Sequence, residues 1–171
     1  MGRPTPIARA GAVPDVETRA NRDHHDSLRL WLRMLATTNL IEARIRQRLQ
    51  QRFGTTLPRF DLMAQLERVP DGLKMGELSR RMMVTGGNVT GITDALEREG
   101  LVTRIGVPHD RRASRVRLTG SGRKAFRAMA SAHEQWIIEA FAALDGGELA
   151  RLGQLLGRVK EHVRAVQDTA I

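Results

Sequence analysis

Residues with the chemistry to contact a nucleic acid lie close together in the middle of the chain. The amide of Asn88 can form two hydrogen bonds with adenine, and Thr90 suits a phosphate or a thymine methyl group. Gly91 should cost a helix about 1 kcal/mol relative to alanine, so its presence suggests that the backbone approaches a phosphate or base edge closely. The candidate contacts are Arg80, Arg81, Thr85, Gly87, Asn88, Thr90, Gly91, Arg111 and Arg112.

The glycines and the arginines also have purely structural explanations. A packing contact between helices that needs a small residue explains Gly86 equally well, but it explains Gly91 poorly because Gly91 lies away from the apolar stripe. Arg111 and Arg112 suit a narrow minor groove or phosphates, with Asp110 orienting one of them. A solvated hairpin tip is the alternative for the arginines, and the helices that precede them favour the nucleic-acid contact.

The helix that carries most of these residues has both ends marked in the sequence. Thr85 is a good N-cap and Gly100 a natural C-cap, so a helix is predicted between them. A shorter helix is predicted over about residues 74–82, after a helix that begins near Thr56 and a turn over 70–72. The inner stripe of the helix between the two caps is Val89, Ile92 and Leu96.

Two short strands follow this pair of helices. The runs 101–105 and 114–118 alternate apolar and polar residues, as half-buried strands do. Residues 106–112 are predicted to form a loop between them, because they contain glycine, proline and the Asp-Arg-Arg sequence. Helix, turn, helix, strand, basic loop and strand make up a winged helix-turn-helix, in which the second helix enters the major groove of DNA.

Long amphipathic helices are predicted on both sides of this winged unit. Apolar residues recur at helical spacing over about residues 26–53, and Gly54 ends that helix. Thr119 caps a fifth helix, and Asp145 and Glu148 have the spacing of a capping box that starts a sixth. One winged domain does not need so many apolar-striped helices to cover its own core, so the first, fifth and sixth helices are expected to form a homodimer.

We therefore expect a mainly α protein with a small β-wing. Residues 1–22 are expected to form a mobile arm; a tail without a role is favoured over an arm that touches DNA. The winged helix-turn-helix domain is expected over 57–119, and N- and C-terminal dimerisation helices over 23–56 and 120–171.

The distribution of charge points to the same partner. The net charge is +9, and residues 74–124 contribute +6 of it, with eleven basic residues against five acidic ones. Residues 1–58 contribute +5, whereas 59–73 and 125–171 contribute −1 each. A basic patch is often only a solvated surface, but beside a helix-turn-helix it favours nucleic acid.

Several classes of protein are excluded or disfavoured. The chain has no cysteine, hence no thiolate metal site and no thiol switch. It lacks a P-loop, a G-x-S-x-G motif and any cofactor signature, so neither an enzyme nor a bound cofactor is expected. No apolar run is long enough to cross a membrane, and the N-terminus lacks the apolar segment of a secretory signal, so a cytoplasmic protein is expected.

The histidines are weak candidates for a metal site. Residues 23–26 read Asp-His-His-Asp, which is capable of chelation, but no HxxxH or other supporting pair is present. His133 lies on the apolar stripe of its helix, so a packed histidine is the favoured interpretation. No metal site is expected, and a zinc-responsive regulator is kept only as an alternative.

The winged segment resembles the MarR family of bacterial regulators. The resemblance rests on ELSRRM before VTGGNVTGITDALEREGLV, and on a wing that reads Asp-Arg-Arg-Ala at 110–113, then Val116-x-Leu118-Thr119 and Gly122. It covers about residues 25–168 and implies an obligate homodimer that regulates transcription at a palindrome. By the resemblance, Gly87, Asn88, Thr90 and Gly91 read DNA, and Arg112 is the wing arginine. Gly91 departs from the arginine that relatives often have, so base preference is not carried over.

The resemblance also implies a small-molecule effector that releases the DNA. Candidate cavity residues are Trp31, Met34, Leu35, Thr38, Asn39, Arg44, Phe60 and Met63, although methionine and aromatic residues at helical spacing are usually core. The run from 57 to 82 is similar to regulators that respond to hydroxycinnamoyl-CoA thioesters in aromatic-acid catabolism. If that holds, Arg33, Arg44 and Arg48 would meet the CoA phosphates.

The function expected from the sequence is thus a homodimeric, ligand-responsive transcriptional regulator, most readily a repressor. It would bind a palindromic operator and be released by an aromatic acid or an aromatic acyl-CoA. A sequence-tolerant architectural DNA-binding protein is the main alternative, because the charge pattern alone permits it.

Overall fold

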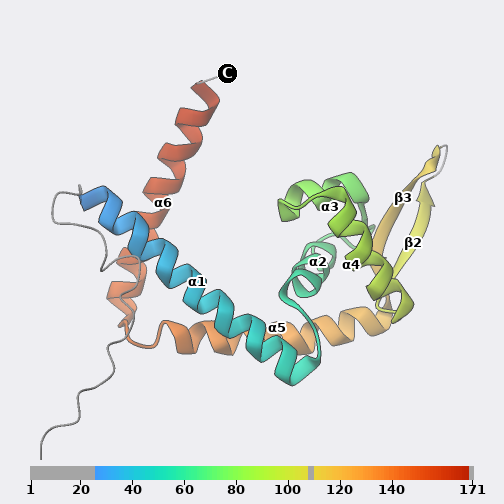
Figure 1. Cartoon of the computed structure of the whole chain (residues 1–171), viewed down its shortest axis with the longest axis horizontal. Coiled ribbons are helices and arrows are strands. Elements are labelled where there is room, and N and C mark those ends of the chain that lie inside the picture. The colour runs from blue at the N-terminus through green and yellow to red at the C-terminus, as the bar shows by residue number, and fades with distance from the viewer. Residues whose placement is uncertain (1–25, 108–109, 170–171) are drawn as a thin grey trace, which may run out of the picture. The chain divides into compact units, whose positions relative to one another are not determined.

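The computed structural model describes residues 26–107 and 110–169, although the side chains at 107, 110–113 and 167–169 are not described. The expected arm at 1–22 and the histidines at 24 and 25 lie outside the described residues. The elements in chain order are α1 (Asp26–Phe53), α2 (Leu57–Glu67), β1 (Leu73–Lys74), α3 (Met75–Met82), α4 (Gly86–Arg98), β2 (Val102–Val107), β3 (Asp110–Leu118), α5 (Gly120–Ala140) and α6 (Gly146–Thr169) (Figure 1).

The chain divides into two compact units, residues 1–44 and residues 45–171. The described part of the first unit is the N-terminal part of α1. The second unit contains the end of α1 and every later element. The mainly helical fold with a small antiparallel sheet confirms the expected fold class.

Local capping signals set the helix boundaries as expected. Gly54 follows α1 with φ +62°, and Gly100 follows α4 with φ +69°, the left-handed conformation that favours glycine. Thr85 occupies the N-cap position of α4, but its side chain makes no capping hydrogen bond. At the start of α6 the capping box is complete: the N–H of Glu148 donates to Asp145 Oδ1 at 2.8 Å, and the N–H of Asp145 donates to Glu148 Oε2 at 3.0 Å.

The sheet has three antiparallel strands in the order β1-β3-β2. The two-residue strand β1 pairs Leu73 with Val116, an element that the sequence did not predict. Gly72 precedes it with φ +80°, and an alanine Cβ there would lie 2.5 Å from the carbonyl oxygen of Val116. The backbone can therefore approach β3 this closely only with glycine at position 72.

The predicted wing loop over 106–112 was wrong in its extent. The strands continue beyond the predicted runs: Gly106 pairs with Ser114, and Val107 pairs with Asp110 across a register shift. The backbones of Arg111 and Arg112 therefore belong to β3, and only 108–109 lie outside the described elements. Glycine, proline and aspartate are typical of loops, but ladder pairing with the opposite strand extends the hairpin here.

The core of the second unit lies between its helices and the inner face of the sheet. The helices α2, α3, α4 and α5 and the strand β3 contact one another around it, and the green α3 and α4 lie beside the yellow hairpin in Figure 1. Leucine, valine and methionine side chains make most of this core, including Leu49, Leu62, Met63, Leu66, Leu78, Val89, Leu96, Val102, Val116 and Leu118.

The end of α4 is tied to the start of α5 by a group of hydrogen bonds. The carbonyl oxygen of Gly100 accepts from Thr119 Oγ1 at 2.7 Å and from Ser121 Oγ at 2.9 Å. The carbonyl oxygen of Leu101 accepts from the N–H of Thr119 at 3.1 Å. Thr119 Oγ1 also accepts from the N–H of Gly122 at 3.0 Å, which confirms Thr119 as the N-cap of α5.

Candidate nucleic-acid interface

One side of the N-terminal half of α4 is exposed and carries few side chains. Gly86, Gly87, Asn88 and Gly91 are all exposed. A Cβ added at any of the three glycines would meet no other atom within 4 Å. Packing within this chain therefore does not explain the glycines, including Gly86, for which that explanation was open. The surface offers the N–H groups of a helix N-terminus, the geometry that binds phosphate well.

A hydrogen bond within α4 limits the groups on DNA that the Thr90 side chain can contact. Its hydroxyl donates to the carbonyl oxygen of Gly86, 3.0 Å away on the preceding turn. While this bond holds, the hydroxyl proton is not available to a phosphate. Thr90 then offers its methyl group and an oxygen lone pair, which suits a thymine methyl group better than a phosphate.

The opposite side of α4 holds it in place. Val89 and Leu96 are fully buried, as predicted, and so is Thr93, which the sequence did not indicate. The Thr93 hydroxyl donates to the carbonyl oxygen of Val89 at 2.8 Å, which satisfies it within the core. A threonine with an internal partner can occupy an apolar stripe, and periodicity counted over apolar residue types does not reveal it.

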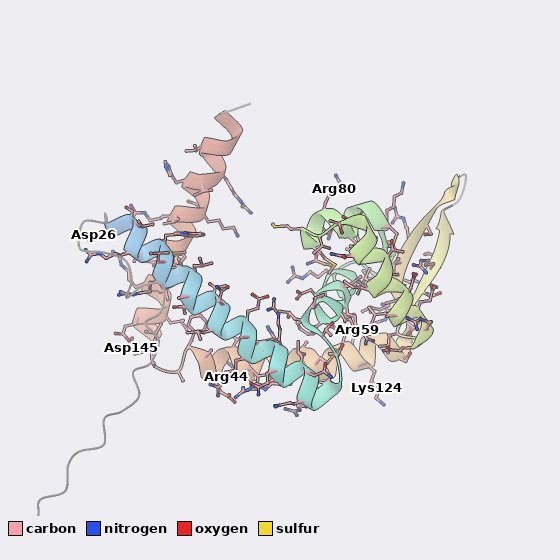
Figure 2. The ribbon with its side chains drawn as sticks, in the orientation of Figure 1. Asp26, Arg44, Arg59, Arg80, Lys124 and Asp145 are labelled. Carbon is pink, nitrogen blue, oxygen red and sulfur yellow. The ribbon has the colours of Figure 1, made fainter. Side chains whose placement is uncertain are left out.

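The end of α3 brings two arginines beside this surface. Arg80 and Arg81 are both exposed, and Figure 2 shows Arg80 extending outward from α3. Arg81 donates to Glu77 Oε1 one turn earlier at 2.6 Å, an exposed pair of the kind that contributes little stability. Ser79 Oγ donates to the carbonyl oxygen of Val84 at 2.6 Å and fixes the turn between the two helices.

Arg104 on β2 connects the wing to α4. Its guanidinium donates to Asp94 and Glu97, both on α4, and its backbone N–H donates to Glu97 Oε1 at 3.1 Å. The hydrogen bond to Asp94 is the largest cause that raises the pKa of Arg104, so the guanidinium stays charged. The acidic side chain on the exposed side of α4 is therefore paired. This cluster could not be predicted from the sequence, because its partners belong to different elements.

For the two wing arginines the structure describes the backbone and not the side chains. Arg111 and Arg112 are in the first half of β3, next to the hairpin end. Their side chains, and that of Asp110, lie outside the described part of the structure. The nine predicted contact residues thus fall on the end of α3, the N-terminal cap and half of α4, and the outer part of the wing.

The predicted effector residues lie on α1 and α2, the two helices to which they were assigned. Six of them lie in the N-terminal part of α1, within the first unit, and Trp31 there is 56% exposed. Phe60 is buried, with its ring 5.5 Å from that of Phe126 and 5.0 Å from that of His133. Met63 alone among the eight lines the pocket described in the second unit.

That pocket has a volume of about 170 Å³. It lies between the end of α1, α2, the segment after α4, and α5. Arg59 is on its wall and forms an ion pair with Glu99, which also lines it. The other lining residues are Phe53, Gly54, Thr55, Met63, Leu101, Ala125, Ala128 and Met129.

His133 behaves as a packed side chain. Burial lowers its pKa, which favours the neutral imidazole beside the Phe60 ring. Within residues 26–107 and 110–169, no three histidine, aspartate or glutamate side chains come together in a way that would hold a metal ion. No helix in the same ranges is long and apolar enough to span a membrane.

These elements define a winged helix-turn-helix protein. Residues 53–113 match the sequence model of the MarR family. A crystal structure of a MarR family transcriptional regulator from Silicibacter pomeroyi is 31% identical with a TM-score of 0.68, over 81% of this chain and 95% of that one. The chain belongs to the MarR family of DNA-binding transcriptional regulators, and it is not an enzyme.

The chain is also similar to other known proteins. AbsC from Streptomyces coelicolor has the same fold, with a TM-score of 0.71 at 24% identity over 85% of this chain and 99% of that chain. Sco3205 from the same organism, solved in complex with DNA, has a TM-score of 0.68 at 25% identity over 78% and 88%. The transcriptional activatory protein BadR from Rhodopseudomonas palustris is 31% identical over 60% of this chain, an alignment that spans 59% of BadR.

Proposed function

We propose that the protein is a homodimeric, effector-responsive repressor that binds a palindromic operator. The observation that carries the proposal is the exposed side of the N-terminal half of α4, where three glycines leave room for a DNA backbone beside Asn88. Arg80 and Arg81 flank this surface, and an arginine-bearing wing follows it. In this proposal, Thr85 and Thr90 complete the contact surface on α4, and Arg111 and Arg112 contact phosphates or a minor groove.

The proposed dimer is supported by apolar side chains that this chain leaves uncovered. Leu152, Leu156, Val159 and Val163 recur at helical spacing on α6 and are between 36% and 50% exposed. A continuous row of this kind is typical of a helix that packs against a partner. A two-fold dimer would present two copies of α4 to half-sites about one helical turn apart. In the proposal, 23–56 and 120–171 form this interface, 57–119 bind DNA, and the protein acts in the cytoplasm.

The operator contact is tested with duplexes that the full-length protein enriches from a randomised library. Footprinting should show protection confined to a palindrome. Asn88→Ala should weaken binding to that duplex at least about tenfold, because each half-site loses a bidentate base contact. Alanine is a better helix former than asparagine, so the helix itself should not suffer.

Gln154→Ala is the matched control, because it removes an exposed amide from α6 without touching α4. It should leave affinity unchanged. Uniform protection of random DNA at the same salt concentration would show an architectural protein instead. Equal affinity of Asn88→Ala and wild type for the selected duplex would remove Asn88 from the base contacts.

We also propose that a small aromatic acid is the effector. The pocket of about 170 Å³ has the size for a single substituted ring, and most of its lining is apolar. Its arginine, Arg59, is paired with Glu99, so an aromatic carboxylate would have to replace Glu99 as the partner of that guanidinium. An aromatic acyl-CoA, such as a hydroxycinnamoyl-CoA, would place only its acyl part there.

The effector proposal is tested by release of the selected duplex. Free aromatic acids and their CoA thioesters are titrated against the complex, and one class should release the DNA. Ala128→Leu fills the pocket from α5 and should abolish release while DNA affinity stays at the wild-type value. Release that is unchanged in Ala128→Leu would place the effector outside this pocket.

A further inference from the structure

Met83 has an unusual backbone conformation for its residue type. It caps α3 with φ 55° and ψ 37°, the left-handed region. In the described part of the chain it is the one residue other than glycine with a positive φ. A residue with a Cβ pays about 1–2 kcal/mol for this conformation, which glycine and asparagine adopt more readily.

The turn around Met83 keeps this conformation fixed. Its N–H donates to the carbonyl oxygen of Arg80 at 3.3 Å, and the N–H of Val84 donates to that of Ser79 at 3.2 Å. The hydroxyl of Ser79 closes the turn through the carbonyl oxygen of Val84. The backbone path is therefore imposed by the helix-turn-helix, and a glycine at position 83 would satisfy it with less strain.

Packing within the chain does not offset the backbone strain at Met83. The Met83 side chain is 93% exposed, more than any other large hydrophobic side chain among the described residues. Its neighbours along the chain are the exposed Arg80 and Arg81 on one side, and the exposed Thr85 and the exposed start of α4 on the other. Met82 and Val84, directly beside it in the chain, are partly exposed, but the fully exposed residues around Met83 are basic, polar or glycine.

The chemical character of the surface around Met83 indicates which group its side chain would contact. Basic residues and the N–H groups of a helix N-terminus attract phosphate, so in the proposed operator complex this surface faces DNA. The 5-methyl group of thymine is the apolar group that base pairs present in the major groove. A flexible thioether side chain is well suited to pack against such a methyl group.

We propose that Met83 is a specificity-determining residue that contacts a thymine methyl group at the edge of each half-site. The inference rests on the proposed operator binding and adds one base preference to it. Met83 supplies an apolar contact, whereas Asn88 supplies hydrogen bonds, so the two residues read different features of the site.

The test selects duplexes from one randomised library with wild-type protein and with Met83→Gly in parallel. Glycine removes the side chain and suits the left-handed backbone, so the turn should remain folded. Wild type should enrich a thymine in each half-site that Met83→Gly does not enrich. Replacing that thymine by deoxyuridine, which lacks only the methyl group, should weaken wild-type binding about fivefold and leave Met83→Gly unaffected.

Two further variants make the test specific. Met83→Leu keeps an apolar side chain and should keep the thymine preference, whereas Met83→Asn tolerates the backbone and should lose it. Identical selections by wild type and Met83→Gly, or an equal effect of deoxyuridine on both, would overturn the proposed role of Met83. The operator proposal would still stand in that case. A wild-type protein that enriches no sequence would overturn the operator proposal itself.

Discussion

Gly122→Ala is expected to lower the free energy of unfolding by about 3 kcal/mol or more. A Cβ at this position would lie 1.9 Å from the carbonyl oxygen of Leu101 and 2.9 Å from its carbonyl carbon. Both contacts are with backbone that is itself held by Thr119, so neither side can move away without breaking the cap of α5. Urea unfolding at equal protein concentration measures the effect, since a dimer's stability depends on concentration.

Gly120→Ala is the matched control, two residues earlier in the same turn. A Cβ there meets no atom within 4 Å, so the change should stay within about 0.5 kcal/mol. Equal stability of the two variants would mean that α5 and the segment after α4 are less closely packed than described. Because glycine is required at position 122 for packing, the loss should appear with or without DNA.

Leu156→Asp is expected to convert the proposed dimer into a monomer. Leu156 is 39% exposed in the single chain, in the middle of the uncovered apolar row of α6. A carboxylate in a two-fold interface would be buried twice, close to its symmetry copy, at a cost of several kcal/mol. A monomer holds only one half-site, and losing the linked second contact should weaken operator binding at least about 100-fold.

Sedimentation and fluorescence anisotropy on the selected duplex would measure both effects. Gln154→Asp places the same charge on the other side of α6, where it should change neither the oligomeric state nor the affinity. If Leu156→Asp remained a dimer with wild-type affinity, the interface would have to lie on other helices. If it became a monomer yet bound DNA as tightly as wild type, dimerisation would not be needed for operator binding.

Features determined by neighbouring residues were predictable from the sequence. Thr85, Gly100 and the capping box of Asp145 and Glu148 mark the ends of helices because their side chains or backbones satisfy groups within a few residues. The order of helices and strands followed from these boundaries and from apolar periodicity. The family resemblance of the winged segment is confirmed for the same reason, since its motifs are local.

Features that depend on distant partners were not predictable. The strand β1 forms because Leu73 pairs with Val116 on β3. The wing strands extend beyond the predicted runs because Gly106 pairs with Ser114. Arg104 finds Asp94 and Glu97 only after β2 packs beside α4. Composition around each of these residues is compatible with a loop or an exposed surface, so their roles emerge only from the tertiary arrangement.

The candidate site likewise has one part that could be predicted from local sequence and one part that could not. The exposed side of α4 could be predicted because a helical period places Gly87, Asn88 and Gly91 on one side. The pocket could not be predicted, because its walls come from four segments, and of the expected residues only Met63 reaches it. Met83 was overlooked because a methionine in a turn shows neither its left-handed backbone nor its exposure in the sequence.

The hydrogen bonds of Thr119 and Ser121 to the carbonyl oxygens after α4 also have a mechanical meaning. They join the segment directly after α4, the helix proposed to read DNA, to the first turn of α5. A torque on the first turn of α5 must either turn the end of α4 or break several bonds at once. Deuterium exchange at the amides of Leu101, Thr119 and Gly122 should therefore report one shared opening event rather than three independent ones.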